Sequence, residues 1–211
     1  MYAYRTVKAN AEFVFEVKRS VFYAAACHAE SAEEAMAYLR QRAREHPKAT
    51  HHCYAFALGP SRAVARSSDA GEPAGTAGRP ILAAMEAKNV SDAAIVVTRY
   101  FGGSKLGAAG LARAYSRASA GALDEATLVP MEKRAFVEAL IPYGRLEGAK
   151  RYLASRSARI RSEEFGEAVK VLFSVREKDA NSVSEYLERH EMARGCAAIG
   201  VCYEPSGGET C

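Results

Sequence analysis

Residues 95–123 read IVVTRYFGGSKLGAAGLARAYSRASAGAL and form the most informative stretch of the 211-residue chain. A β-branched run ends near Arg99, the chain breaks at Gly102-Gly103, and an alanine- and leucine-rich segment follows. This order predicts a strand, a glycine turn and a helix. Glycine suits a positive φ or a close approach to the backbone, and the first N–H groups of a helix attract anions. The turn is therefore either a packing hinge or an anion seat.

Four cations lie near the start of this predicted helix, with no acid close to them in sequence until Asp124. Phosphate binding is a physically sensible use of cations beside a helix start and an accessible glycine backbone. The glycine spacing matches neither G-x-G-x-x-G nor G-x-x-x-x-G-K-[ST], which argues against a known nucleotide cradle. The predicted anion- or nucleic-acid-binding residues are Arg99, Gly102, Gly103, Lys105, Gly107, Arg113 and Arg117.

The segment upstream predicts two strands and a helix. Residues 13–26 are apolar and aromatic, with Lys18-Arg19-Ser20 in the middle, and this favours two strands joined by a basic turn or bulge. Ser31, with Glu34 three residues later, is typical of a capped helix start. Pro47 then ends the helix.

A second candidate pocket begins in the strand predicted at residues 50–58, THHCYAFAL. Alternate strand residues face opposite ways, so His51 and Cys53 share one face while His52, Tyr54 and Phe56 share the other. Adjacent histidines on opposite faces cannot both bind one ion without distortion, and no fourth ligand stands at a standard spacing. We therefore predict no metal site and no cofactor.

Residues 67–80, SSDAGEPAGTAGRP, predict a long ordered loop, because glycine and proline interrupt any regular element. Asp69 and Glu72 are its only acids. They are either a carboxylate pair that binds a metal or acts as acid and base, or groups that hold the loop together. Thr76 is expected to cap a helix over residues 79–88. The candidate pocket residues are His51, His52, Asp69, Glu72 and Thr76.

Composition indicates a folded, soluble, cytoplasmic protein. The net charge is +4, and the whole basic excess falls within residues 1–130. Such an excess permits an anionic partner without requiring one. The five cysteines form no C-x-x-C pair, which argues against a disulfide framework and a zinc finger. No segment is long and apolar enough to span a bilayer, and the first residues lack the layout of a signal peptide.

The rest of the chain predicts a second domain and an α+β fold class. Residues 127–133, with Pro130 among them, are the expected linker, and residues 136–203 have the order β-α-β-β-α-β of a ferredoxin-like sandwich. We expect domains at 1–129 and 130–204, and a disordered tail at 205–211. A second group of cations is either a solvated surface or another anionic-partner surface: Arg145, Lys150, Arg151, Arg156, Arg159 and Arg161.

Three motifs together resemble the IMPACT family, whose bacterial members are often called YigZ-like. They are ATHHCYAFALG, SSDAGEPAGTAGRPIL and VVTRYFGGSKLGAAGLARAYSRA, within a similarity that covers about residues 10–125. The resemblance implies an N-terminal domain like ribosomal protein S5 domain 2, and a ferredoxin-like C-terminal domain similar to one in elongation factor G. It also implies a translation-linked or RNA-linked role. The family commonly has Asp-Asp-Gly-Glu-Pro, whereas this chain has Ala70 at the second acid, which weakens a paired-carboxylate mechanism.

Our leading hypothesis is a translation-linked regulatory protein that binds RNA or a ribosome-associated partner through the basic strand, glycine turn and helix. The alternative is an enzyme acting on a small phosphorylated or peptide-like substrate at the acidic loop. That alternative predicts a concave site where the acidic loop meets the glycine turn. No G-x-S-x-G or H-E-x-x-H motif supports it, and the resemblance transfers no catalytic residue. A scaffold that binds a protein partner is a third option.

Overall fold

A computed structural model describes residues 3–206 and shows a mixed α+β protein. The chain divides into two compact units, with the boundary between Met131 and Glu132. We call residues 3–131 the N-terminal unit and residues 132–204 the C-terminal unit. Each unit has its own hydrophobic core, so each is described by itself.

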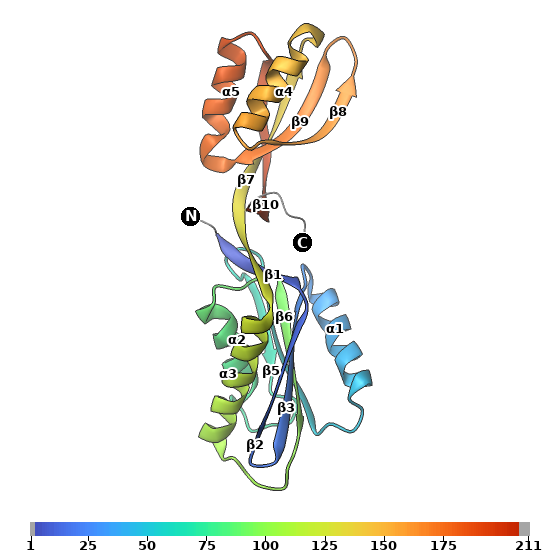
Figure 1. Cartoon of the computed structure of the whole chain (residues 1–211), viewed down its shortest axis with the longest axis vertical. Coiled ribbons are helices and arrows are strands. Elements are labelled where there is room, and N and C mark those ends of the chain that lie inside the picture. The colour runs from blue at the N-terminus through green and yellow to red at the C-terminus, as the bar shows by residue number, and fades with distance from the viewer. Residues whose placement is uncertain (1–2, 207–211) are drawn as a thin grey trace. The chain divides into compact units, whose positions relative to one another are not determined.

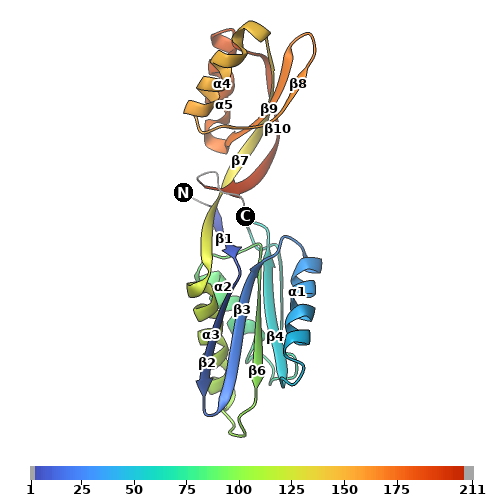
Figure 2. The same cartoon turned by 45° about the vertical axis from the view of Figure 1, so that its right-hand side comes forward.

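The N-terminal unit contains a five-stranded sheet, an additional strand and three helices (Figure 1). Its elements are β1 (Tyr4–Ala9), β2 (Ala11–Val17), β3 (Ser20–His28), α1 (Ala32–Glu45), β4 (His51–Leu58), β5 (Val64–Ser68), α2 (Gly78–Ala87), β6 (Ala93–Tyr100) and α3 (Ala108–Glu125). The strand order is β2-β3-β6-β4-β5, and every neighbouring pair is antiparallel. Helices α2 and α3 cover one face and α1 covers the other (Figure 2).

The predicted strand, turn and helix at residues 95–123 are confirmed as β6, a glycine turn and α3. Strand β6 lies in the middle of the sheet because it carries apolar side chains on both faces, and all but one of its residues are buried. In register, Arg99 pairs with Phe22 of β3 and with His51 of β4. The central position of β6 therefore brings three segments to the same end of the sheet: the β2–β3 turn, the end of β6 and the start of β4.

Other local predictions in this unit also hold. Strands β2 and β3 form a hairpin whose turn residues, Lys18 and Arg19, have positive φ of 47° and 63°. The Ser31 side chain accepts a hydrogen bond from the Glu34 N–H, as the predicted helix cap requires. Helix α3 buries its apolar face, which includes Leu111. These elements succeed as predictions because their signals are local in sequence.

The C-terminal unit contains the second half of β7 (Thr127–Ile141) and the strands β8 (Arg159–Phe165), β9 (Val169–Arg176) and β10 (Arg194–Pro205). Its helices are α4 (Leu146–Ser155) and α5 (Ala180–Arg189), and two short 3-10 helices are η1 (Tyr143–Arg145) and η2 (Glu177–Asp179). The chain order is strand, helix, two strands, helix, strand, as predicted. Strand β9 lies between β7 and β8, and β10 pairs with β7. The core lies between this sheet and the two helices.

The predicted linker at residues 127–133 contains the boundary between the two units, and these residues form the first half of β7. Strand β1 pairs with Thr127–Met131, a partner far away in sequence that no local pattern indicates. Pro130 fits this strand, where it lies opposite Arg5. Of the tail predicted to be disordered, Pro205 ends β10 and the Ser206 N–H donates to the Pro130 carbonyl at 2.8 Å, whereas residues 207–211 lie outside the described residues.

Candidate functional site

The glycines of the turn between β6 and α3 serve two purposes. A Cβ on Gly102 would lie 2.0 Å from the Arg19 carbonyl carbon, so this glycine lets the turn pack against the β2–β3 hairpin. Gly103 and Gly107 have φ of +82° and +73°, and a Cβ on either would meet open space. Gly102 therefore serves packing, whereas Gly103 and Gly107 leave the backbone of the turn accessible.

The start of α3 is open to an anion. Gly107 is the N-cap residue, no side chain caps this end, and the first turn holds no acid. The first N–H groups of the helix have no partner within the helix, and its dipole adds partial positive charge. The physical requirements of an anion seat are therefore present.

Five exposed cations lie on the β2–β3 turn, the glycine turn and the first ten residues of α3, and we call them the basic surface. Lys18 and Arg113 line a shallow cavity of about 220 Å³ between the hairpin turn and α3. Arg19 donates to the Ser104 hydroxyl at 3.3 Å, which brings the hairpin turn to the glycine turn. Within residues 3–206 none of the five forms an ion pair with a carboxylate. The basic surface comprises Lys18, Arg19, Lys105, Arg113 and Arg117.

Arg99 differs from the exposed phosphate contact that the sequence suggested. It is only 4% exposed, and its guanidinium contacts the Glu72 carboxylate at 2.6 Å and the Ser20 hydroxyl at 3.2 Å. The guanidinium carbon also lies 5.4 Å from the ring centroids of Phe22 and Phe101. Arg99 therefore holds the acidic loop to the sheet, and its charge is neutralised.

The ion pair belongs to a buried polar network. Tyr115 of α3 donates to the same Glu72 oxygen at 2.8 Å, and the Cys53 sulfur lies 3.3 Å from the Tyr115 hydroxyl. Burial raises the pKa of the Cys53 thiol to about 12 and also raises the pKa of the Tyr115 hydroxyl, so both groups keep their protons at neutral pH. The network joins the acidic loop, β4, β6 and α3.

Asp69 and Glu72 do not form a carboxylate pair, because Glu72 forms an ion pair with Arg99. The Asp69 carboxylate accepts backbone N–H groups from Gly75, Ala77 and Gly78 at 2.8 to 2.9 Å. Burial alone would raise the pKa of Asp69, but these three donors hold it below its usual value. The loop-holding alternative is therefore the one that the structure supports for Asp69.

The predicted Thr76 cap of α2 is wrong. The N-cap residue is Ala77, and the Thr76 hydroxyl donates instead to the Pro73 carbonyl at 2.6 Å. Asp69 satisfies the helix start from eight residues upstream of Ala77. A cap supplied from outside the usual window has no local sequence signal, which explains the error.

The two histidines face opposite sides of the sheet, as the alternation predicts. His51 donates from Nδ1 to the Ala70 carbonyl at 2.9 Å, whereas His52 Nδ1 lies 3.1 Å from the Thr98 hydroxyl on the side covered by α1. Burial, with a smaller contribution from His46, lowers the pKa of His52. Among residues 3–206, no group of three or more His, Cys, Asp or Glu side chains has the arrangement of a metal site.

A larger cavity of about 380 Å³ lies where the acidic loop meets the glycine turn. Glu72 and His51 line it, together with Arg99, Lys105 and the first residue of α3, Ala108. His52, Asp69 and Thr76 are not among its lining residues. The structure therefore brings two of the five candidate pocket residues together with two of the predicted cations.

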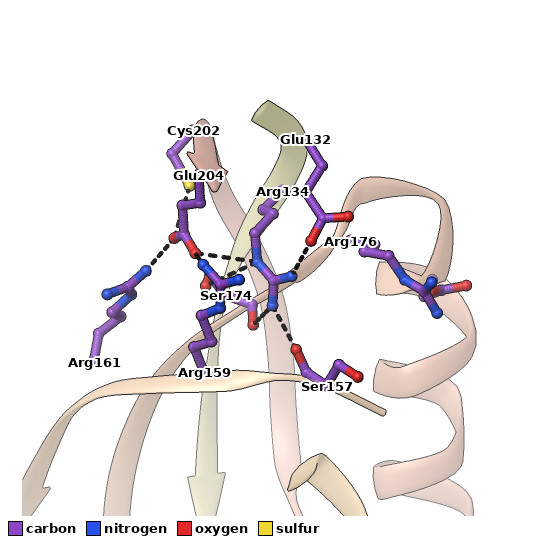
Figure 3. Close-up of polar contacts among 10 residues, drawn as sticks. Glu132, Arg134, Ser157, Arg159, Arg161, Ser174, Arg176, Cys202 and Glu204 are labelled. Carbon is purple, nitrogen blue, oxygen red and sulfur yellow. Dashed lines mark hydrogen bonds and ion pairs between the residues drawn. The ribbon is translucent and has the colours of Figure 1, made fainter. Parts of the chain in front are cut away.

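The second cation group, in the C-terminal unit, is largely neutralised where its arginines lie on β8. Glu204 of β10 accepts from Arg159 at 2.6 Å and from Arg161, and the buried Arg134 lies 3.2 Å from the same carboxylate (Figure 3). Lys150 pairs with Glu163 at 2.8 Å. These contacts favour a structural role for Arg159, Arg161 and Lys150, whereas Arg145, Arg151 and Arg156 are exposed and form no ion pair within residues 3–206.

Sequence reasoning missed three residues of the site. Lys18 and Arg19 were recognised only as a basic turn, because their proximity to α3 depends on the pairing of β3 with β6. Tyr115, on the buried face of α3, is absent from the predicted site residues, although a buried tyrosine hydroxyl usually has a hydrogen-bond partner. This preference of buried tyrosines is the one signal in the sequence that indicates a buried acceptor near α3.

Comparison with known proteins places this site in a family. The model of the Impact N-terminal domain matches residues 18–123, half of the chain. The chain belongs to the IMPACT family. The matched region contains the whole basic surface, the acidic loop and the glycine turn.

Curated relatives extend the similarity beyond that domain. The IMPACT family member YvyE of Bacillus subtilis is 30% identical over 89% of this chain and 86% of its own length. An IMPACT family member of Haemophilus influenzae is 32% identical over 92% of this chain and 95% of its own length. The Escherichia coli member YigZ is 43% identical over 48% of this chain and 51% of its own length.

A solved structure resembles this IMPACT family protein along nearly its whole length. It is a crystal structure described as that of a hypothetical protein, 28% identical, with a TM-score of 0.65 over 95% of this chain and 98% of that one. This agreement supports the mixed α+β architecture. None of the helices in residues 3–206 has the length and apolar composition that spanning a bilayer requires.

Proposed function

We propose that this IMPACT family protein is a cytoplasmic, translation-linked regulator that binds RNA through the basic surface. The observation that carries the proposal is the basic surface of five exposed cations around the glycine turn and along α3, none of which pairs with a carboxylate in the described part of the chain. Cations that the fold leaves unpaired remain available to phosphate.

The geometry of the basic surface suits a phosphate backbone better than a single small anion. Its members come from the β2–β3 turn, the glycine turn and two turns of α3, so the charge is spread over a surface. Arg117 also stacks on Phe15, with the guanidinium carbon 4.7 Å from the ring centroid, which fixes one cation in place. Spread and partly fixed cations position a nucleic-acid strand without reading its bases.

The aromatic face of β4 adds no base-stacking surface to this proposal. Phe56 is buried and Tyr54 packs with it beneath α1, in a cluster that includes Ala35. Base recognition by stacking requires exposed rings. We therefore expect binding with little sequence preference.

The domain assignments belong to the same proposal. The observed order in the C-terminal unit, with β9 between β7 and β8, supports a ferredoxin-like domain at residues 130–204. We assign the N-terminal domain, predicted at residues 1–129, to the fold of ribosomal protein S5 domain 2. Both assignments agree with a translation-linked protein.

A binding experiment tests the function directly. The salt dependence of the affinity for a single-stranded RNA is measured by fluorescence anisotropy for the wild type and for Arg113→Ala plus Arg117→Ala. Loss of two phosphate contacts lowers the affinity and reduces the slope of log K against log salt by about 1.4. The matched control is Arg40→Ala plus Arg44→Ala, two exposed arginines with the same spacing on α1.

Two results would overturn the proposal. In the first, the Arg113 and Arg117 variant binds RNA as tightly as the wild type at every salt concentration. In the second, the protein captures its partner from lysate equally well with and without ribonuclease, which would indicate an acidic protein partner.

An enzyme at the acidic loop remains the alternative function. The cavity at that loop favours it, but Asp69 is committed to the start of α2 and Glu72 to Arg99. A metabolite-mixture screen by thermal shift, with Glu72→Ala as control, tests it. The absence of any ligand-dependent shift would count against an enzyme.

A further inference from the structure

The cavity of about 380 Å³ in the N-terminal unit has a wall of buried polar side chains that take no part in the proposed RNA surface. Its volume falls within the range of small-molecule sites, roughly 300 to 1,000 Å³. The wall is formed by Glu72 and Arg99, whose side chains are 3% and 5% exposed. Such groups are costly to bury and are rigidly held once paired, which is what a specific binding site requires.

The two wall residues have hydrogen-bonding capacity left over. Both bonds to the Glu72 carboxylate, from Arg99 and Tyr115, go to Oε1, and Oε2 accepts no hydrogen bond from residues 3–206. Arg99 Nε is buried and is the single buried side-chain nitrogen or oxygen without a partner in the described structure. Because Arg99 Nε is fully buried, the free Glu72 Oε2 is the polar group of this wall that a ligand in the cavity can contact.

Other lining residues of the cavity favour negative charge. Glu72 and Arg99 cancel each other, which leaves Lys105 as the remaining full charge among the lining residues apart from the titratable His51. Ala108, at the uncapped start of α3, lines the same cavity. The helix dipole and Lys105 therefore act together on an anionic group.

An apolar surface completes the cavity. Phe101 is 47% exposed, although a phenylalanine ring is normally buried, and it lines the cavity beside Leu106 and Leu111. Its ring lies against the Arg99 guanidinium, 5.4 Å from the centroid. A hydrocarbon group placed here would remove apolar surface from water, which favours binding.

We propose that this cavity binds a small amphipathic organic anion. The anionic group lies at the start of α3 beside Lys105, a neighbouring hydroxyl or ammonium group donates to Glu72 Oε2, and the hydrocarbon body packs on Phe101. An α-hydroxy or α-amino acid with an apolar side chain has this arrangement of groups. The site shares Lys105 and the start of α3 with the RNA proposal, whereas Glu72, Arg99 and Phe101 belong to the cavity alone.

Calorimetric titration of the full-length protein with a matched set of probes tests the ligand chemistry. The probes are 2-hydroxy-4-methylpentanoate, its 2-amino counterpart, 4-methylpentanoate, 4-methylpentanol and inorganic phosphate. At least one of the first two is expected to saturate the site, and 4-methylpentanoate, which lacks the donor, to bind about tenfold more weakly. The uncharged alcohol shows no saturable binding. Phosphate binding that equals or exceeds that of the substituted acids would overturn the amphipathic ligand in favour of a plain phosphate seat.

Two charge substitutions test the location. Ala108→Glu places a carboxylate at the cavity and, because acids suit the first turn of a helix, does not destabilise α3. It is expected to weaken binding of the best carboxylate probe at least tenfold. The matched control, Ala109→Glu, puts the same charge on the next exposed residue, which does not line the cavity, and should weaken binding only about twofold by its weaker field.

Two outcomes contradict this inference. One is that no carboxylate probe binds saturably at millimolar concentration to the folded protein. The other is that Ala108→Glu and Ala109→Glu bind the best probe equally well. Arg113→Ala plus Arg117→Ala leaves the cavity intact and is expected to retain carboxylate binding, so the failure of this inference is distinguishable from failure of the RNA proposal.

Discussion

The two units of this IMPACT family protein use clustered arginines in opposite ways. In the C-terminal unit, three arginines converge on the Glu204 carboxylate (Figure 3), and Arg134 also pairs with Glu132 at 2.8 Å. In the N-terminal unit, the basic surface has no carboxylate partner among the described residues. Similar densities of positive charge therefore have different meanings, and the position of acids in space decides between them. The number of cations in a sequence segment therefore does not tell whether they stabilise the fold or bind a partner.

The largest expected effect comes from removing the acid that neutralises the C-terminal cluster. Glu204→Gln leaves the buried Arg134, with a side chain 1% exposed, short of one partner, and we expect a loss of about 3 kcal/mol of unfolding free energy. Hydrogen exchange of β8 and β9 at neutral pH measures the loss within this unit. The control is Glu167→Gln, an exposed acid in the β8–β9 turn. Unchanged protection in Glu204→Gln would show that the cluster is not structural.

An intermediate effect is expected at Asp69, the acid in the N-terminal unit that binds backbone rather than cations. Asp69→Ala removes the acceptor of three N–H groups and should cost about 2 kcal/mol at pH 7. Because the pKa of Asp69 is lowered in the folded state, its contribution is present above the ordinary aspartate pKa of about 4 and is lost as the pH falls through the lowered value.

Urea unfolding of Asp69→Ala and the wild type across this acidic range measures the pH effect. The free-energy difference between them should shrink as the pH falls below about 4. Glu86→Ala, which removes an exposed acid of α2, is the control. A difference that stays constant with pH would mean that the negative charge of Asp69 contributes nothing.

The smallest effect on stability is expected from the basic surface itself. Arg113→Ala plus Arg117→Ala removes two exposed cations without ion pairs, together with the stacking of Arg117 on Phe15, and should lower the free energy of unfolding by about 1 kcal/mol or less. Thermal unfolding beside the Arg40 and Arg44 control measures it. A large loss of stability would place these arginines with the structural cluster of the other unit and remove the basis of the contrast.

Much of the fold was predictable because its signals are local. Alternation identified β4, helical spacing identified α3, and the turn residues separated β8 from β9. The pairing of residues 127–131 within the predicted linker was missed, since their partner β1 is about 120 residues earlier in the chain. Pairing over such a separation leaves no periodic trace in either segment.

The sequence predicted which loops form the site, but it did not predict which charged side chains are buried and paired there. The acidic loop and the glycine turn meet at one cavity, as the enzyme alternative expected of a concave site. The burial of Arg99 was not predictable, because it depends on Glu72, which is 27 residues away and reaches it only through the fold. Asp69 was open to two interpretations for the same reason, since its donors Ala77 and Gly78 belong to the next helix.

The contact between Glu72 and Arg99 carries a consequence for how the protein evolves. Loss of either charge alone leaves the other buried at 3% to 5% exposure, so a single substitution at position 72 or 99 would be strongly selected against. A simultaneous replacement of both by apolar residues avoids that penalty. Across diverging lineages these two positions should therefore be inherited as a pair, changing together or not at all.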